Sequence, residues 1–445
     1  MNQNQKHGEA NTRTADWFQE GKVNELMFLE NIRNNLTHFR YSGGRFYDQE
    51  EHVMDDSEVQ DIFLDMLKPY VTTGLYKLSS QLLALAKIRW RFESFSSSNT
   101  LIHLQNGTLN LCTMELEERQ FTLYRLPVCY NPDAKSPVNF LRFLHDLLEE
   151  EDILTLQEYV GYCLRPCTDA QKMLMLVGRG GEGKSTLGHV LAMLFGEQAV
   201  MGSIQKICTN RFARADLEGK LLVIDDDMSM DALPETSYLK TLVTLKGKTD
   251  LERKGKQSYQ GVLYARFLGF SNGSLSALYD RSEGFYRRQL ILTCKERPKD
   301  RIDYVNLEEQ MRAELDGILI WALVGLARLV GNDYRFTVSA QTRKNLDDAR
   351  RDANSAMEFL ESEGYISYDR TGCASSRALY NAYRTFCEDN SLHPISNRSF
   401  LLYLKQQQRR LGITYTSHLP TEPNRSIRGY EGIRIVPGHS LRMIG

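Results

Sequence analysis

Short apolar runs alternate with helical patterns through the middle of the chain. Residues 172–177 (KMLMLV) form a short apolar run, and residues 185–195 carry an apolar stripe at helical spacing. Further apolar runs occupy residues 221–224, 266–271 and 289–293. Buried strands that alternate with helices are typical of a parallel sheet covered by helices. We therefore predict an α/β core between residues 172 and 293.

The flanking segments have different patterns. Residues 22–99 are mostly helical in pattern, with a hairpin predicted at Gly43 and Gly44 and a second at Asn106 and Gly107. The chain after the core ends in helices followed by a hairpin, which indicates a winged helix. Further helices are expected over residues 139–148, 153–163 and 306–330. We predict a flexible N-terminus (1–20), a helical and β-containing accessory domain (21–150), a core domain (151–335) and a winged-helix-like domain (350–445).

Composition narrows the class of protein. Of 445 residues, 42% are hydrophobic and 25% are charged, and no apolar run reaches the roughly 18 residues of a membrane span. The first residues contain no apolar signal core, so we expect a cytoplasmic protein without a membrane partner. The net charge of −2 gives no general argument for a polyanionic partner. Any prediction of nucleic-acid binding must rest on local clusters.

The stretch GRGGEGKST between the first strand and helix of the core matches the pattern G-x-x-x-x-G-K-[ST]. In such a loop the backbone N–H groups surround phosphate oxygens, Lys184 reaches the β- and γ-phosphates, and Ser185 ligates Mg²⁺. A glycine-rich turn without a phosphate is the alternative, and the strand and helix on either side argue against it. We predict that ATP and Mg²⁺ bind here. The predicted contacts are Gly178, Gly180, Gly181, Glu182, Gly183, Lys184, Ser185 and Thr186.

Two further strands of the core end in polar residues. Asp225, Asp226 and Asp227 follow the run at 221–224. Two adjacent carboxylates can hold Mg²⁺ and orient an attacking water, although an acidic turn is the simpler alternative. Asn272 follows the next strand and is either a turn cap or a sensor of the γ-phosphate. Arg287, next to a second arginine at 288, precedes the last strand and is either an ordinary surface residue or a finger supplied to a neighbouring subunit.

Basic residues gather at two places. Arg253, Lys254 and Lys256 lie around Gly255, which suits a hairpin turn, although most such runs are solvated loops. Residues 391–445 contain eight Lys or Arg and two Glu. Within them, the basic side chains on or near one predicted helix are Arg398, Lys405, Arg409 and Arg410. A basic winged helix contacts duplex DNA or, alternatively, a protein partner.

The motifs GRGGEGKST, GKLLVIDDDMS, LERKGKQ, FLGFSN and DRSEGFYRR, in this order, resemble the superfamily 3 helicase core of the phage and plasmid primase-helicase family, which is related to poxvirus-type primase-helicases. HLQNGTLNL and PVCYNPDAKSP upstream and ELDGILIWALVGL downstream extend the resemblance. It implies an AAA+-type P-loop core and a hexameric ring that moves 3′ to 5′ on single-stranded DNA. It also implies a role in replicating a mobile element in a bacterial cytoplasm.

The resemblance also assigns roles to single residues. It implies that Lys184 and Ser185 serve phosphate and Mg²⁺, and that Asp226 and Asp227 are the acidic pair, with Asp226 on the metal side. The third aspartate leaves Asp225 with Asp226 as the alternative pair. Asn272 is the implied sensor, and Arg288 is favoured over its neighbour as the finger. The resemblance also implies a hairpin that lines a channel, and its residues are Arg253, Lys254 and Lys256.

The leading functional hypothesis is an ATP-dependent replicative DNA helicase that acts on single-stranded and forked DNA. No stretch resembles a primase domain, so primer synthesis is left to a separate primase or polymerase. An ATP-controlled initiator that melts an origin without sustained unwinding is the first alternative. A P-loop kinase is the second, and it is disfavoured because it explains neither the basic hairpin nor the arginines after Asn272.

Overall fold

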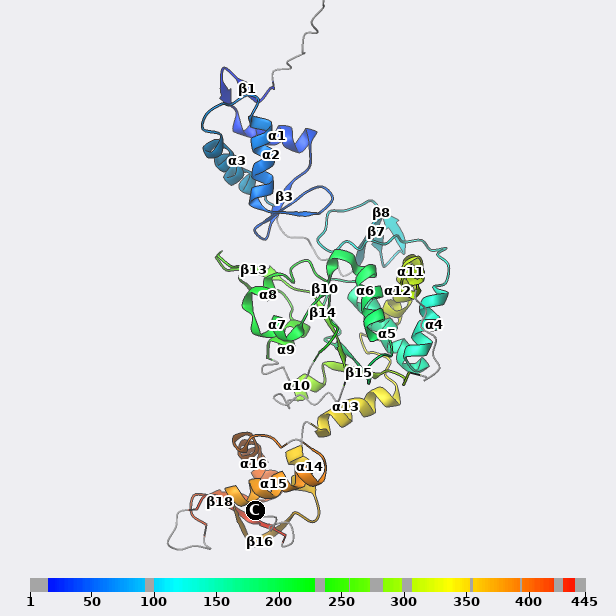
Figure 1. Cartoon of the computed structure of the whole chain (residues 1–445), viewed down its shortest axis with the longest axis vertical. Helices are drawn as coiled ribbons and strands as arrows, with labels where there is room; N and C mark the ends of the chain where they lie inside the picture. The colour runs from blue at the N-terminus through cyan, green and yellow to red at the C-terminus, as the bar shows by residue number, and fades with distance from the viewer. Residues whose placement is uncertain are drawn as a thin grey trace, which may run out of the picture.

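The computed structural model describes residues 15–92, 100–228, 237–255, 257–272, 283–297, 306–352, 355–392, 394–419 and 427–436. The molecule is elongated, with an N-terminal unit, a central unit and a C-terminal unit following one another along its long axis (Figure 1). The expected α/β class is correct, because the central unit contains a five-stranded parallel sheet with many helices.

The N-terminal unit is a helical unit with small antiparallel sheets. Its elements are β1 (Phe18–Gln19), β2 (Lys22–Val23), α1 (Glu25–Asn35), β3 (Arg40–Ser42), β4 (Arg45–Tyr47), β5 (Val53–Met54), α2 (Asp56–Leu67) and α3 (Leu75–Arg89). The β3–β4 turn contains Gly43 and Gly44, as predicted. We predicted a flexible N-terminus up to residue 20. In the structure, Trp17 is buried against Phe28 and Tyr70, so the folded unit begins before residue 20.

Residues 100–163 form a second hairpin and two helices. They comprise β6 (Leu101–Leu104), β7 (Gly107–Asn110), β8 (Glu115–Glu117), α4 (Val138–Leu147) and α5 (Glu150–Cys163). We predicted that residues up to 150 belong to the accessory domain. In the structure, side chains such as Leu104, Leu126 and Phe140 share one hydrophobic core with the central sheet, whereas the N-terminal unit has its own core. Buried apolar contact therefore assigns this segment to the central unit.

The central sheet has the strand order β10-β11-β14-β9-β15, and every neighbouring pair is parallel. Its strands are β9 (Met173–Val177), β10 (Ala199–Met201), β11 (Leu222–Asp225), β14 (Arg266–Ser271) and β15 (Gln289–Thr293). Val177 lies opposite Ser271 and Thr293, and Asp225 lies opposite Gly269. The carboxyl ends of these strands therefore meet at one edge of the sheet.

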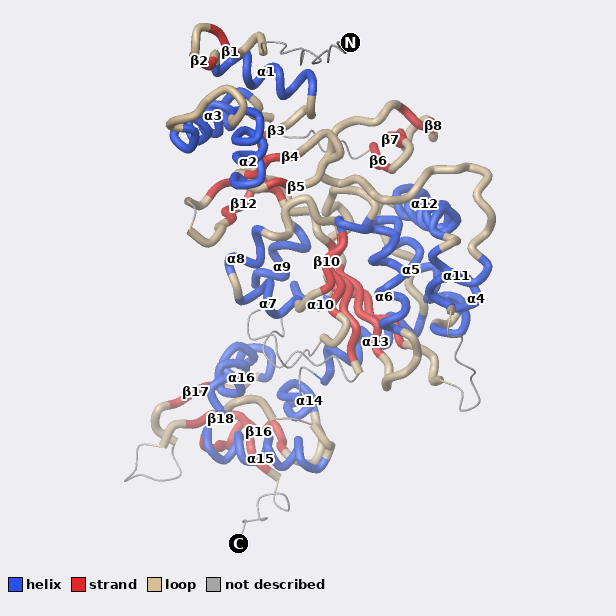
Figure 2. Tube along the Cα trace, turned by 45° about the horizontal axis from the view of Figure 1, so that its top comes forward, coloured by secondary structure: helices blue, strands red, loops and turns tan. Residues whose placement is uncertain are grey.

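Helices cover both faces of the sheet (Figure 2). Side chains alternate along each strand, so Leu174 and Leu176 enter one core while Met173 and Met175 enter the other. The first core includes α5, α6 (Lys184–Phe195) and α12 (Leu315–Gly331). The remaining elements of the central unit are the 3-10 turn Gly196–Gln198, α7 (Ile204–Thr209), α8 (Arg211–Ala215), α9 (Ser237–Thr244), β12 (Lys248–Leu251), β13 (Tyr259–Val262), α10 (Glu283–Tyr286), α11 (Leu307–Arg312) and α13 (Ala340–Asp352).

Two glycines allow α5 and α12 to cross closely. A Cβ on Gly161 would lie 2.3 Å from the Ala322 carbonyl oxygen, and one on Gly325 would lie 2.3 Å from the Gln157 carbonyl oxygen. Any larger residue would separate the helices. The apolar sequence of α12 is explained by this packing, and among the described helices none is long and apolar enough to span a membrane.

The C-terminal unit combines three helices with a three-stranded antiparallel sheet. Its elements are α14 (Ser355–Glu361), β16 (Ile366–Ser375), α15 (Ser376–Asp389), α16 (Asn397–Leu411), β17 (Thr414–Thr416) and β18 (Gly429–Ile435), with the sheet order β16-β18-β17. We predicted the helices and the last hairpin, but not β16. Only three of the ten residues of that strand are buried, so its sequence lacks the apolar alternation of a buried strand.

Candidate functional site

The glycine-rich loop connects the end of β9 to the start of α6. Gly180, Gly181 and Gly183 have φ values of 109°, 82° and 115°, a region that residues with a Cβ rarely adopt. Lys184 is the first residue of α6. Ser185 and Thr186 follow in the first turn, where backbone N–H groups point out of a helix and favour anions. The local structure is thus the strand–loop–helix unit expected from the sequence.

The carboxylate of Glu182 lies inside this loop. Its Oε1 atom accepts hydrogen bonds from the backbone N–H groups of Arg179 and, at 2.8 Å, Gly180, while Oε2 lies 2.7 Å from Lys184 Nζ. Burial raises the pKa of Glu182, but the hydrogen bonds from Lys184 and the backbone outweigh it, so the pKa is lowered overall. The ionised Glu182 side chain therefore uses the donors that a bound phosphate would need.

A polar pocket of about 590 Å³ opens beside the loop. Lys184 and Ser185 line it together with Asp226 and Asn272. These residues converge because β14 lies between β9 and β11, and each strand ends at the same edge. The condition on which the sensor interpretation of Asn272 depended, a strand beside the other two, is therefore met.

The three aspartates have different surroundings. Asp225 is buried, and its Oδ2 atom accepts a hydrogen bond of 2.7 Å from the backbone N–H of Ile204. Burial raises the pKa of Asp225. Asp226 is exposed and lines the pocket, and Asp227 is exposed but does not line it. Of the two acidic pairs considered, this geometry favours the one without Asp225.

Arg287 and Arg288 lie away from this pocket. They precede β15, and Gln289 is aligned with Met173, whereas the glycine-rich loop follows Val177. The two arginines therefore lie at the opposite edge of the sheet from the loop of their own chain. Arg287 is exposed, and the Arg288 guanidinium donates to the Gly284 carbonyl oxygen.

Sequence reasoning missed several residues that line the pocket: Leu307, Glu308 and Glu309 at the start of α11, and also Arg297 and Phe143. Arg297 lines it and donates to the Gly181 carbonyl oxygen at 3.4 Å. Phe143 packs so closely on the loop that a Cβ on Gly183 would lie 3.0 Å from its ring. Arg297 lies just after the carboxyl end of β15, a position that the strand assignment alone indicates. Nothing in the sequence of α4 points to Phe143.

Among the described residues, no three His, Cys, Asp or Glu side chains gather as a metal-binding group. Mg²⁺ at nucleotide sites is held by one or two protein oxygens together with phosphates and waters. The Ser185 hydroxyl and the Asp226 carboxylate, which line the same pocket, suit that limited protein contribution.

The predicted basic hairpin is present as β12 and β13, which pair antiparallel from Lys248 opposite Val262 to Leu251 opposite Tyr259. Lys254 is exposed at its tip, where Gly255 has a φ of 75°. Arg253 has a different environment: its Nη2 lies 2.8 Å from Glu218 Oε2, and its Nη1 donates to the Gly43 carbonyl oxygen. Lys256 lies outside the described residues.

The basic residues of the C-terminal unit lie on α16. Arg398, Lys405 and Arg409 are all exposed. At 100° per residue their positions fall within roughly 40° of one another, so they form one stripe along the helix. Arg410 points elsewhere, with its Nη2 2.9 Å from Glu361 Oε1.

Comparisons with known proteins give a fold but no assigned activity. Residues 176–288 match a family described as "Family of unknown function (DUF5906)". An apo structure of the C-terminal region of NrS-1 (residues 305–718) is similar, with a TM-score of 0.54 and 11% identity over 92% of this chain and 99% of that chain. The A form of that apo region gives a TM-score of 0.52 and 12% identity over 87% of each chain. The chain therefore has the fold of the NrS-1 C-terminal region.

Proposed function

We propose that this chain is an ATP-dependent DNA helicase of the superfamily 3 type, a ring motor for the replication of a phage, plasmid or similar element. The observation that carries the proposal is the convergence of Lys184, Ser185, Asp226 and Asn272 on one pocket at the carboxyl edge of a parallel sheet. A lysine, a hydroxyl, a carboxylate and an amide in this arrangement suit a magnesium nucleotide and its attacking water. The fold shared with the C-terminal region of NrS-1 is compatible with the proposal.

Each side chain has a chemical part in the proposed hydrolysis. Lys184 binds the β- and γ-phosphates, and Ser185 with Asp226 holds the Mg²⁺ that neutralises their charge. Asn272 orients the attacking water from the γ-phosphate side. Asp227, the second member of the acidic pair, orients and activates that water. Arg297 supplies a positive charge within the same chain, and Arg288 supplies one to the adjacent subunit of a ring.

The proposed DNA contacts are Lys254 at the tip of the β12–β13 hairpin and the stripe on α16. Lys254 is exposed and stands apart from the pocket, so a nucleic-acid backbone can reach it. In the C-terminal unit, the order helix, strand, helix, helix, strand, strand with β18 in the middle of the sheet supports a winged helix. Its α16 then presents the Arg398, Lys405 and Arg409 stripe to a duplex.

Unwinding of a forked DNA with ATP tests the proposal directly. Wild-type protein is expected to displace the labelled strand, and Lys184→Ala to lose both ATP hydrolysis and displacement, because the loop loses its cation for the phosphates. Lys254→Ala is expected to retain basal ATPase but lose DNA stimulation and unwinding. Its binding to single strands should have a salt slope shallower by about one phosphate contact per affected subunit.

Lys77→Ala is the matched control, since Lys77 is also exposed but lies on α3 of the N-terminal unit. It is expected to behave as wild type. ATP-dependent opening of an origin without displacement of a fork strand would favour the initiator instead. ATPase that DNA never stimulates, with no opening, would contradict both.

A further inference from the structure

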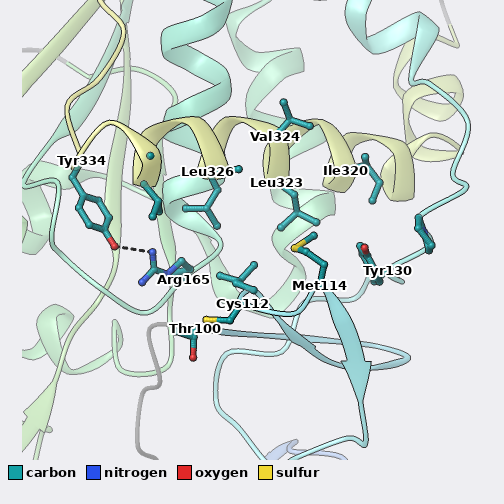
Figure 3. Close-up of a pocket in the computed structure, with 15 residues that line it drawn as sticks. Thr100, Cys112, Met114, Tyr130, Arg165, Ile320, Leu323, Val324, Leu326 and Tyr334 are labelled. Carbon is teal, nitrogen blue, oxygen red and sulfur yellow. Dashed lines mark hydrogen bonds between the residues drawn. The ribbon is translucent and has the colours of Figure 1, made fainter.

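A second, apolar groove lies between α12 and the loop that follows β7 (Figure 3). Its volume is about 770 Å³, within the range of pockets that enclose ligands. In Figure 3, Leu323 and Leu326 on α12 lie on the side of the helix that faces Met114 and Cys112. The groove shares none of its lining residues with the pocket at the glycine-rich loop.

Arg165 gives one end of this groove a positive charge. The residue is only 4% exposed, and its Nη1 donates to the Tyr334 hydroxyl at 2.9 Å. Its buried Nε has no hydrogen-bond partner among the described residues. A buried guanidinium N–H without an acceptor is costly. The end of the groove is therefore complementary to an anion.

The chain fixes Tyr334 beside Arg165 with an unusual backbone. Asp333 and Tyr334 have φ values of 50° and 58°, which non-glycine residues adopt at a cost of about 1 kcal/mol or more each. The Tyr334 N–H donates to the Leu329 carbonyl oxygen at 2.9 Å, which ties this segment to the end of α12. The phenol retains a hydrogen that it can donate to a ligand oxygen.

The rim of the groove is apolar and exposed. The exposed fractions of Met114, Val324 and Val330 are 46%, 53% and 43%. A free fatty acid would fill the groove and satisfy Arg165, but it would leave these rim side chains in water. A segment that belongs to a folded partner covers the groove and the rim together.

We propose that the groove binds the C-terminal tail of a partner protein. The terminal carboxylate lies against Arg165 and Tyr334, and the apolar side chain of the last residue lies between Met114 and Leu323. Charged hydrogen bonds from a guanidinium to a carboxylate are among the stronger ones, and capture of a chain terminus is a recurrent mode of peptide recognition.

Fluorescence anisotropy with the full chain tests this proposal. The probes are N-terminally labelled peptides Gly-Ser-Gly-Ser-Leu-X, with X as Phe, Leu or Ile, each made with a free carboxylate and as the amide. At least one peptide with a free carboxylate is expected to bind saturably. Its amide is expected to bind at least about tenfold more weakly, because a charged hydrogen bond is lost. Arg165→Gln is expected to remove the difference between the two forms.

Because Arg165 is buried, Val324→Glu on the exposed rim provides a second variant that leaves the core intact. It is expected to weaken both peptide forms about tenfold. Ile88→Glu, at a position 74% exposed on α3, is the control and should bind as wild type. Equal binding of acid and amide, no binding of any peptide, or binding of dodecanoate without any peptide would each overturn the proposal.

Discussion

At the scale of single residues, the three adjacent aspartates show how the fold separates identical side chains. Asp225 points into the protein and accepts the Ile204 N–H, whereas Asp226 faces the pocket. Asp226→Asn is expected to lower ATP turnover at least about a hundredfold while nucleotide binding remains, since it acts on metal and water. Asp225→Asn should mainly change the melting temperature. ATP turnover and nucleotide binding, measured on both variants, show which aspartate acts on the metal. Loss of turnover in Asp225→Asn but not in Asp226→Asn would assign the metal to Asp225.

Glu182 leads to a second prediction at this scale. Its carboxylate holds Lys184 and two backbone N–H groups, so an incoming phosphate must displace it and also meets its negative charge. Glu182→Gln is expected to lower the dissociation constant for ATP about tenfold, because a neutral amide competes less for the lysine. Titration with a fluorescent ATP analogue measures this change.

The control for this titration is Glu296→Gln. Glu296 Oε1 lies 2.7 Å from Arg179 Nη1 on the outside of the same loop, and its side chain is largely exposed. Little change in affinity is expected from it. Weaker binding by Glu182→Gln would mean that the carboxylate assists the nucleotide, for instance through the metal.

The strand–loop–helix geometry of the loop was predictable from sequence, because an apolar run, a glycine-rich stretch and an amphipathic stretch follow one another there. Glu182 occupies a position that the motif leaves free, so its contact with Lys184 was not predictable. Arg297 was missed for another reason: it follows β15 in a polar run without a motif, and only the strand alignment brings it to the pocket.

At the scale of elements, the β6–β7 hairpin carries a pH-dependent contribution to stability. Burial, with a smaller effect of Arg125, lowers the pKa of His103 from 6.5 to about 4. Below pH 6.5 the unfolded chain binds a proton that the folded hairpin does not, so stability is lost as the pH falls from 6.5 towards 4. Between pH 7 and pH 5 we expect a loss of about 1 to 2 kcal/mol from this group.

Hydrogen exchange at Ile102 and Leu109, which pair across the hairpin, measures this loss. His103→Gln should reduce the dependence on pH by that amount, because glutamine does not titrate. His145→Gln, at an exposed position on α4, is the control. An identical dependence in wild type and His103→Gln would contradict the assignment.

The elements differed in how well their sequences predicted them. Strands β9, β11, β14 and β15 of the central sheet and the β12–β13 hairpin were predicted because apolar runs and a turn glycine mark them, whereas the short edge strand β10 was not predicted. The polar stretch near residues 337–354 had no assigned structure, yet residues 340–352 form α13. Its charged sequence gives little apolar periodicity, and tertiary contacts such as the Asn345 side chain to the Ile291 carbonyl oxygen, at 2.9 Å, support it.

At the scale of the whole molecule, the position of Arg288 leads to a prediction about the proposed ring of subunits. Gln289 is aligned with the start of β9 and the loop follows its end, roughly 13 Å along the strand, so Arg288 does not reach its own pocket. Arg288→Ala and Lys184→Ala proteins are each expected to be inactive. A one-to-one mixture should recover up to about a quarter of wild-type ATPase, the share of ring interfaces with both residues intact.

Wild-type protein mixed with Lys184→Ala controls for subunit exchange, and co-assembly is followed by labelling one variant. Mixing without recovery, despite labelled co-assembly, would assign the finger to Arg287 or to a residue of the same chain such as Arg297.

The bond from Arg253 to the Gly43 carbonyl oxygen joins residues 210 positions apart and connects the hairpin to a turn of the N-terminal unit. Glu218 reinforces the connection from the central unit, since it holds both Arg253 and, at 2.9 Å, the Tyr259 hydroxyl. The hairpin therefore cannot move far without displacing that turn or breaking a partly buried ion pair. If the protein moves along DNA as proposed, each step then becomes a tilt of the N-terminal unit. A pair of fluorophores on the outside of the protein would record those steps with no label on the DNA.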